Sequence, residues 1–235
     1  MNGTDRSLHP GVDAVGMRPR PDTPELADRR AAVAELGAAL RELLAATVLS
    51  EAPVDVLRQV ATQVTALTEP LAAVQRPLAR PASVDDLVSG VRMYNPVIGE
   101  GSPVAPPLRI EYEDDRVLAR CTLGPQHEGP HLYAHGGVTA MLLDQILGHA
   151  VAAVGAIGVT IDLTTRYRRP VPLGEPLLLW AEAVGGDGER TTARGALTTA
   201  SDPETPLAQA EGRFRKLELR QVQRMYAALF DTPDP

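Results

Sequence analysis

The sequence predicts an α+β fold in which an antiparallel β-sheet wraps around one long central helix, preceded by a helical hairpin. An unbroken apolar run at 137–154 is apolar on nearly every face, which is typical of a buried helix. Extended runs joined by short turns lie on both sides of it in the sequence. Hairpin-connected strands around a single helix indicate an α+β domain. Since one sheet cannot cover every side of such a helix, we expect a second subunit to pack against it.

Composition narrows the class of protein further. The 235 residues, 44% of them hydrophobic, suffice for one domain with an extension, and the net charge of −7 argues against a general nucleic-acid binder. A single cysteine, Cys121, excludes an internal disulfide framework and suits a reducing compartment. The start of the chain lacks the apolar segment of a secretory signal, and the run 138–154 is short for a membrane span and contains Asp144 and His149. We therefore expect a cytoplasmic protein without a membrane span.

The helical extension is predicted from two apolar stripes. Thr23 and Pro24 fit the N-cap and first position of a helix, and Pro53 opens a second one. Spacings of three and four residues then indicate amphipathic helices. The stripes are Val33, Leu36, Leu40 and Leu43 in the first helix, and Leu57, Val60, Val64, Leu67 and Leu71 in the second. Together they predict a helical hairpin at 24–71, followed by a linker at about 72–82 and a short helix from Ser83 to Ser89.

Four regions follow from this organisation. We expect a disordered or loosely attached tail at 1–22, the helical extension and linker at 23–90, the sheet domain at 91–218, and a C-terminal short helix and tail at 219–235, with the helix at 219–230. The expected strands are 108–112 and 117–123 before the central helix, and 158–168, 176–184, 191–200 and 207–217 after it.

The segment His135-Gly136-Gly137, followed by Asp144, carries the most chemical information. Glycines at a helix start leave the first backbone N–H groups open to a ligand, where the helix dipole favours negative charge. A carboxylate two turns into an apolar helix is costly unless it has a partner or a task. Fixed N–H donors stabilise negative charge on a carbonyl oxygen, and a carboxylate can accept a proton from water. The segment therefore supplies the groups that attack on a carbonyl requires.

The spacing of these groups predicts an assembly. Gly136 and Asp144 are eight residues apart, which is roughly 12 Å at the rise of a helix. One carbonyl cannot easily meet both groups from the same helix. If both act on one substrate, they come from different protomers, and a two-fold axis then gives a homodimer with two equivalent sites.

Residues 105–217 resemble the hotdog-fold thioesterases, in particular the PaaI-like branch of the thioesterase superfamily. The matching segments are 135–137, Asp144 within 142–144, the strand 158–163, the phrase Tyr167–Gly174, and the strand end Phe214–Leu217. The resemblance implies a hotdog fold, hydrolysis of an acyl-CoA thioester to free acid and CoA, and a place in lipid metabolism. It also implies a homodimer, with tetramers as dimers of dimers left open.

The resemblance assigns roles residue by residue. It implies that Gly136, with Gly137 beside it, polarises the thioester carbonyl, and that Asp144 serves as general base or nucleophile. Thr160 helps to place the attacking water, and His135 shapes the turn and contacts the thioester. No metal and no cofactor are implied beyond the CoA of the substrate.

Candidates for CoA binding lie outside this segment. Arginines suit phosphate groups through their forked donors, and we favour Arg168 and Arg169 over Arg166 at the end of the strand that begins near Thr160. Asn95, in the loop at 94–103, is a further candidate for contact with the substrate.

Other interpretations remain open at this point. A hotdog protein can perform other acyl chemistry, such as dehydration or condensation, or can bind acyl-CoA without catalysis in a regulatory role. The hairpin could cover an acyl tunnel or mediate assembly, although we favour its simply burying extra dimer surface. His127, His131 and His135 have the spacing of metal ligands on a helix, but Gly129-Pro130 breaks any helix there, so we expect no zinc site. The acyl group, and the choice between CoA and an acyl carrier protein, are not specified.

Overall fold

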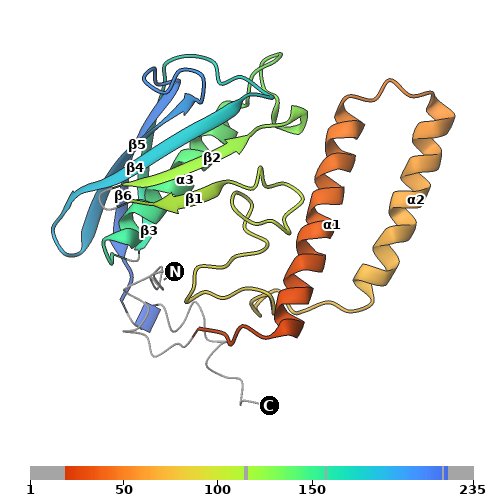
Figure 1. Ribbon diagram of the computed structural model, residues 1–235, viewed down its shortest axis with the longest axis horizontal. Coiled ribbons are helices and arrows are strands. Elements are labelled where there is room, and N and C mark those ends of the chain that lie inside the picture. Colours follow the sequence, from red (N-terminus) through yellow and green to blue (C-terminus); the bar gives the residue numbers. More distant parts are fainter. Residues whose placement is uncertain (1–18, 114–115, 157, 219, 222–235) are drawn as a thin grey trace, which may run out of the picture.

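The computed structural model describes residues 19–113, 116–156, 158–218 and 220–221. It begins with two helices, α1 (Pro24–Val48) and α2 (Val54–Ala72), which form the predicted hairpin beside a sheet domain (Figure 1). Residues 1–18 of the expected tail and nearly all of the expected closing helix at 219–230 lie outside the described residues. Pro70 belongs to the last turn of α2, so the helix continues two residues past it.

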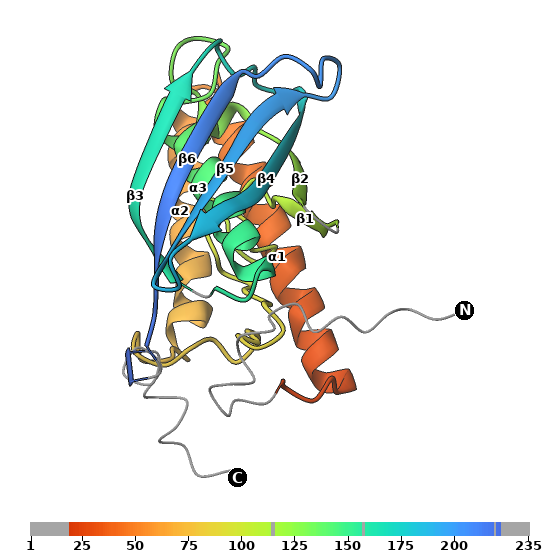
Figure 2. The same cartoon turned by 90° about the vertical axis from the view of Figure 1, so that its left-hand side faces the viewer.

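The sheet domain holds a six-stranded antiparallel sheet and one long helix. The strand order is β1-β2-β4-β5-β6-β3. The helix, α3, lies along one face of the sheet (Figure 2). This confirms the predicted sheet around a central helix. The elements are β1 (Arg109–Tyr112), β2 (Val117–Thr122), a short 3₁₀ helix η2 (Pro125–His127), α3 (Gly136–Ala153), β3 (Gly158–Tyr167), β4 (Pro176–Gly186), β5 (Arg190–Thr199) and β6 (Ala208–Lys216).

The core forms between the sheet and one side of α3. Leu142, Leu143, Ile146 and Leu147 are fully buried there. The opposite side, which includes Met141 and Asp144, is only half-buried, so Asp144 is less buried within one chain than the apolar sequence around it predicts. One sheet thus covers one side of this helix. Among the described residues, no helix combines the length and apolarity needed to cross a membrane.

Strand β3 forms an edge of the sheet and contains a β-bulge. It pairs with β6 alone among the described strands. Thr160 lies opposite Phe214 and Asp162 opposite Arg213, which leaves Ile161 as an extra residue between two pairs. Because successive side chains alternate between the two faces of a strand, this extra residue reverses the alternation. Thr160 therefore shares the helix-facing side with the buried Phe214, whereas Asp162 lies on the outer face and forms an ion pair with Arg213 at 3.1 Å.

Helix α1 is attached to the loop that precedes β1. Thr23 caps it as predicted, with its hydroxyl oxygen accepting from the N–H of Leu26 at 3.2 Å. Gly37 is the one buried residue of α1, and a side chain there would collide with the backbone of Glu100. Arg41 donates to the carbonyl oxygens of Glu100 and Ser102, at 2.7 and 2.8 Å.

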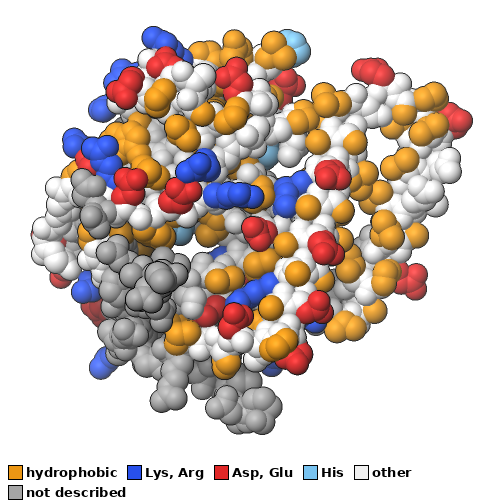
Figure 3. Space-filling view, viewed as in Figure 1, with side chains coloured by type: hydrophobic (Ala, Val, Ile, Leu, Met, Phe, Trp, Pro, Cys, Tyr) orange, Lys and Arg blue, Asp and Glu red, His pale blue; other side chains and the backbone are white. Residues whose placement is uncertain are grey.

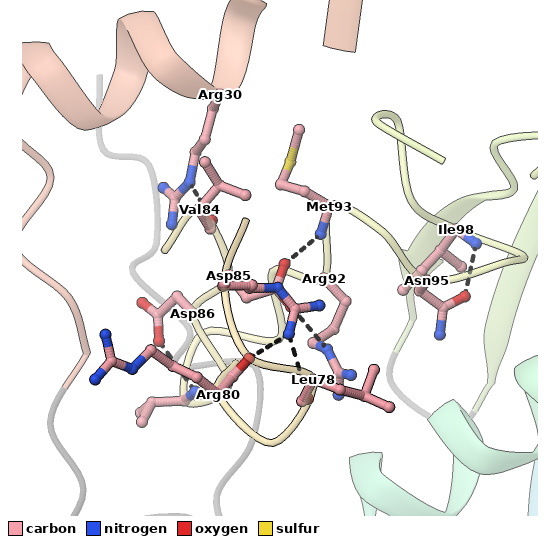
Figure 4. A network of polar contacts seen from close by, with 12 residues as sticks. Arg30, Leu78, Arg80, Val84, Asp85, Asp86, Arg92, Met93, Asn95 and Ile98 are labelled. Atoms are coloured by element: carbon pink, nitrogen blue, oxygen red, sulfur yellow. Dashed lines mark hydrogen bonds and ion pairs between the residues drawn. The ribbon is translucent and has the colours of Figure 1, made fainter. Parts of the chain in front are cut away.

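The short helix expected at 83–89 is wrong, because this segment forms turns and an isolated bridge between Asp86 and Val91. The carboxylate of Asp86 accepts from the N–H groups of Val88 and Ser89 and from the Ser89 hydroxyl. Such local side-chain bonds compete with helix formation. Figure 4 shows the surrounding network, in which Arg30 of α1 donates to the carbonyl of Val84 at 2.9 Å. These contacts fix the lower end of α1 to the turn segment.

Candidate active site

The start of α3 is shaped by the ring of His135. His135 is the N-cap in extended conformation, and its Nδ1 accepts from the N–H of Gly137 at 3.0 Å. The Gly137 amide is thereby engaged within the turn. Gly136 is the first residue of the helix, and its N–H has no acceptor among the hydrogen bonds found in the described chain. The first N–H groups of a helix lack partners within the helix, so the Gly136 amide is available to a carbonyl oxygen.

Tyr167 supports this turn from the end of β3. Its hydroxyl donates to the carbonyl oxygen of Gly136 at 2.9 Å. A Cβ added at Gly136 would lie 3.5 Å from the ring carbon Cζ of Tyr167, so the ring flanks the glycine without crowding it. Tyr167 is not among the site residues predicted from the sequence. The signal in the sequence was its position in the Tyr-Arg-Arg-Pro motif, but neighbouring residues do not indicate that Tyr167 contacts the start of α3.

Asp144 and Thr160 form the second part of the site. The Thr160 hydroxyl donates to Oδ1 of Asp144 at 2.9 Å. The bulge at Ile161 is what turns Thr160 towards α3. Since the hydroxyl occupies one carboxylate oxygen, Oδ2 of Asp144 is left to accept a hydrogen bond from another molecule. Asp144 is half-buried and Thr160 is exposed, so water can reach the pair.

The structure brings the predicted residues together as two separate pairs. His135 contacts Gly137, and Thr160 contacts Asp144. Gly136 and Asp144 lie eight residues apart on the same helix, roughly 12 Å along its axis. A single chain therefore holds an amide donor and a carboxylate at positions that one carbonyl group does not reach together.

The three arginines lie at and beyond the end of β3, and all are exposed. Arg166 shares the outer face of the sheet, opposite Gln209. Arg168 follows the strand, and its Nε donates to the side chain of Gln209 at 3.1 Å. The backbone N–H of Arg169 donates to the carbonyl of Leu207 at 3.0 Å, which fixes the chain there and leaves the Arg169 side chain in solvent.

Asn95 connects its loop to the central helix. Its Oδ1 accepts from the N–H groups of Val97 and Ile98, at 2.8 and 3.1 Å. Nδ2 donates to Oε1 of Gln145 on α3, at 3.3 Å. Asn95 and Ile98 are visible at the edge of Figure 4. Both ends of the Asn95 amide are thus engaged within the fold.

A chain of polar side chains continues from Asn95 along α3. The Gln145 amide nitrogen lies 3.0 Å from Nε2 of His149, and Nδ1 of His149 lies 2.7 Å from the Tyr112 hydroxyl on β1. Burial raises the pKa of Tyr112. The sequence pattern does not predict this chain of polar side chains. The i, i+4 spacing of Gln145 and His149 was the only local signal, and their partners come from segments far away in the sequence.

Comparison with known proteins places this arrangement in a family. The model of the thioesterase superfamily matches residues 131–204. The crystal structure of a thioesterase superfamily protein matches 77% of this chain and 94% of its own, with 32% identity and a TM-score of 0.69. That share exceeds the sheet domain from β1 to β6, so the match takes in part of the extension as well.

Two further solved structures match about half of this chain. Zebra fish thioesterase superfamily member 2 matches 47% of this chain and 81% of its own, at 24% identity and a TM-score of 0.44. The Escherichia coli PaaI protein matches 46% and 82%, at 19% identity and a TM-score of 0.43. The 32% identity over nearly the whole of the first structure is decisive. This chain belongs to the thioesterase superfamily, and its sheet and central helix form a hotdog fold.

Proposed function

We propose that this protein hydrolyses an acyl-CoA thioester to the free acid and CoA. The observation that carries the proposal is the hydrogen bond from Thr160 to Asp144 on a half-exposed side of α3. It holds one carboxylate oxygen and leaves the other accessible, which is the arrangement that a general base for water requires. Membership of the thioesterase superfamily supports the same class of reaction.

The chemistry follows from the two pairs of the site. Asp144 takes a proton from water as the water oxygen attacks the thioester carbonyl carbon. Negative charge then forms on the carbonyl oxygen, where the Gly136 N–H stabilises it. The positive end of the α3 dipole, to which Gly137 contributes, adds to this effect. Collapse of the adduct breaks the C–S bond, and the CoA thiolate leaves and takes up a proton.

A nucleophilic role for Asp144 uses the same geometry. The carboxylate attacks the carbonyl carbon directly, CoA leaves, and the resulting mixed anhydride is hydrolysed by water. The Gly136 N–H stabilises the negative charge in both routes. Incorporation of labelled water oxygen into the Asp144 side chain during single turnover distinguishes them, because hydrolysis of the anhydride at the Asp144 carbonyl leaves the label there.

The proposed site is shared between two protomers. The half-buried side of α3 and the edge of β3 that no described strand pairs with are adjacent surfaces, and a two-fold axis beside them sets two α3 helices antiparallel. Gly136 of one protomer then meets Asp144 of the other. CoA phosphates are proposed to bind Arg168 and Arg169, whose exposed guanidinium groups lie at the β3 end that adjoins Gly136 through Tyr167.

The direct test is release of free CoA over a panel of acyl-CoA substrates. We expect thiol release by the wild type and a loss of about 10²–10⁴-fold in kcat for Asp144→Asn. Asp162→Asn is the matched control, because that carboxylate lies on the outer face of β3 with Arg213. If the wild type releases no thiol for any chain length, hydrolysis is wrong. If Asp144→Asn retains full activity, the assignment of the base is wrong.

A complementation experiment tests the shared site. Gly136→Pro removes the amide N–H at the first helical position, where proline is well tolerated and where His135 already has the extended backbone that proline requires. Mixing this variant with Asp144→Asn gives heterodimers in which one site keeps both groups. We expect the inactive variants to regain about a quarter of wild-type activity when mixed. No recovery, after subunit exchange is verified by mass spectrometry, would contradict a shared site while leaving hydrolysis intact.

A further inference from the structure

Helix α2 presents an apolar stripe that nothing in the described chain covers. The α2 stripe consists of Leu57, Val60, Val64, Leu67 and Leu71, and these side chains are 45%, 37%, 39%, 64% and 55% exposed. The helix has no buried residue. Its 19 residues are near the lower limit for a helix that is stable without packing. The stripe therefore needs a partner.

Helix α1 does not supply that cover. The two helices are joined at one end but stand apart along their lengths (Figure 1). The inner side of α1 is occupied by the loop at 100–102, through Gly37 and Arg41. Leu36, Leu44 and Val48 of α1 remain 43%, 36% and 52% exposed. Figure 3 shows hydrophobic side chains along both helices on the visible face.

The pattern of the stripe fits another helix. Its residues alternate at spacings of three and four, which is the repeat of a seam between two packed helices. A membrane surface is a poor partner, because α2 carries only one cationic side chain, Arg58, beside the acidic Asp55 and Glu69. The stripe is self-complementary in chemistry, since it is apolar and uncharged from Leu57 to Leu71.

The area of the stripe fits a modest contact with a second copy of this chain. By their exposed fractions, the five side chains of the α2 stripe present roughly 400 Å² per chain, so that two copies bury about 800 Å² from the stripe alone, and exposed neighbours such as Val56 enlarge the contact towards the range of specific interfaces. Helix α2 lies on the same side of the sheet as α3 and farther out than α1, where it is accessible to another molecule (Figure 1).

We propose that the hairpin is an association element, in which the α2 stripe packs against the α2 stripe of a second copy about a two-fold axis. The contact is isologous, so a residue near the middle of α2 meets its own copy whether the helices run parallel or antiparallel. Val64 occupies that position. The proposal does not depend on thioester hydrolysis.

The first test measures the mass of the full chain in solution. Val60→Glu with Leu67→Glu places two charges in the stripe, and Gln59→Glu with Ala66→Glu places two charges one residue away, outside it. Sedimentation velocity across a concentration series is expected to show that the stripe variant dissociates into smaller assemblies, with its association weakened on the order of 100-fold. The control variant is expected to keep the wild-type mass. Circular dichroism confirms that both remain folded.

The second test is a cross-link that does not rely on disruption. Val64→Cys is expected to form a disulfide-linked dimer under mild oxidation, whereas Thr62→Cys on the opposite side of α2 is not. Cys121 gives little background, because burial raises the pKa of its thiol to about 12. Leu57→Cys then reports direction, since it cross-links to its own copy only if the helices run parallel.

Two results would overturn the proposal. If the stripe variant keeps the wild-type mass at every concentration and Val64→Cys does not cross-link, α2 does not join two copies. A lower melting temperature of the stripe variant at unchanged mass would mean that another part of the same chain covers the stripe, and would also overturn it.

Discussion

The last residue of β3 holds the first residue of α3: the hydroxyl of Tyr167 donates to the carbonyl oxygen of Gly136 at 2.9 Å. Seven residues earlier on the same strand, Thr160 holds Asp144. Strand β3 therefore runs antiparallel to α3 and contacts both groups to which the proposed chemistry is assigned. The edge strand, as much as the helix, defines the site.

We expect Tyr167→Phe to lower kcat more than stability. The lost hydrogen bond is exposed, and its net value of about 0.5–1.5 kcal/mol corresponds to roughly 2- to 10-fold in rate if it serves to orient the Gly136 amide. Thiol release and thermal unfolding measured on the same preparation separate the two effects. Tyr94→Phe, on an exposed tyrosine of the loop before β1, is the control. An unchanged kcat for Tyr167→Phe would assign this bond to structure alone.

Thr160→Val and Thr160→Ser form a matched pair at Asp144. Valine keeps the shape of the side chain but removes the hydroxyl, so that Asp144 loses its orienting partner; we expect kcat to fall about 10- to 100-fold with little change in KM. Serine retains the hydroxyl and is expected to stay within a few-fold of wild type. Equal losses for both variants would show that the hydroxyl alone does not account for the role of Thr160, because serine retains it.

Asn95→Ala distinguishes a structural role of Asn95 from substrate contact. The structure engages both ends of this amide, with Val97, Ile98 and Gln145. We therefore expect a loss of about 1–3 kcal/mol in unfolding free energy, measured by urea denaturation, and a KM for acyl-CoA that changes less than two-fold. A raised KM at unchanged stability would instead support the contact with CoA that the sequence analysis predicts.

The turn segment that anchors α1 has a predictable pH dependence. Burial by itself raises the pKa of Asp86, but the hydrogen bonds from Ser89, Arg20 and Val88 together outweigh it and hold the pKa below its ordinary value. A carboxyl group whose pKa is lowered on folding stabilises the native state above its unfolded-state pKa, and this stabilisation is lost as the pH falls through the folded-state value.

Asp86→Asn is accordingly expected to cost about 1–3 kcal/mol at pH 7. The gap between wild type and variant is expected to be the same at pH 5 and to narrow by pH 3, in urea denaturation at each pH. A gap that stays constant down to pH 3 would show that the charge on Asp86 contributes nothing to stability.

Much of the fold could be predicted because it is encoded by local pattern. The apolar run of α3, the turn residues between strands, and the cap of α1 at Thr23 each act within a few residues. The short helix expected at 83–89 failed for a related reason. Turns form there instead because the carboxylate of Asp86 accepts from the backbone N–H groups two and three residues ahead.

The candidate site was predictable only in part. His135, Gly136 and Asp144 stand out by sequence because glycines at a helix start and a carboxylate in an apolar helix are locally unusual. Tyr167 and Gln145 do not, since their roles depend on contacts made across the fold. The resemblance to a known family identified Thr160, but only the strand register explains how its side chain reaches the helix.

Because β3 contains an extra residue, the exact number of residues in this strand determines which side chains face α3. Ile161 takes no part in the proposed chemistry, and its own side chain is 44% exposed. Removing Ile161 would restore strict alternation of the side chains along β3. Either Thr160 or the residues from Asp162 onwards would then have to move to the other face of the sheet. A deletion of one codon would thus separate Thr160 from Asp144 while every residue named in the mechanism remained present. Insertions and deletions in this strand are therefore expected to be tolerated less well than most of its substitutions.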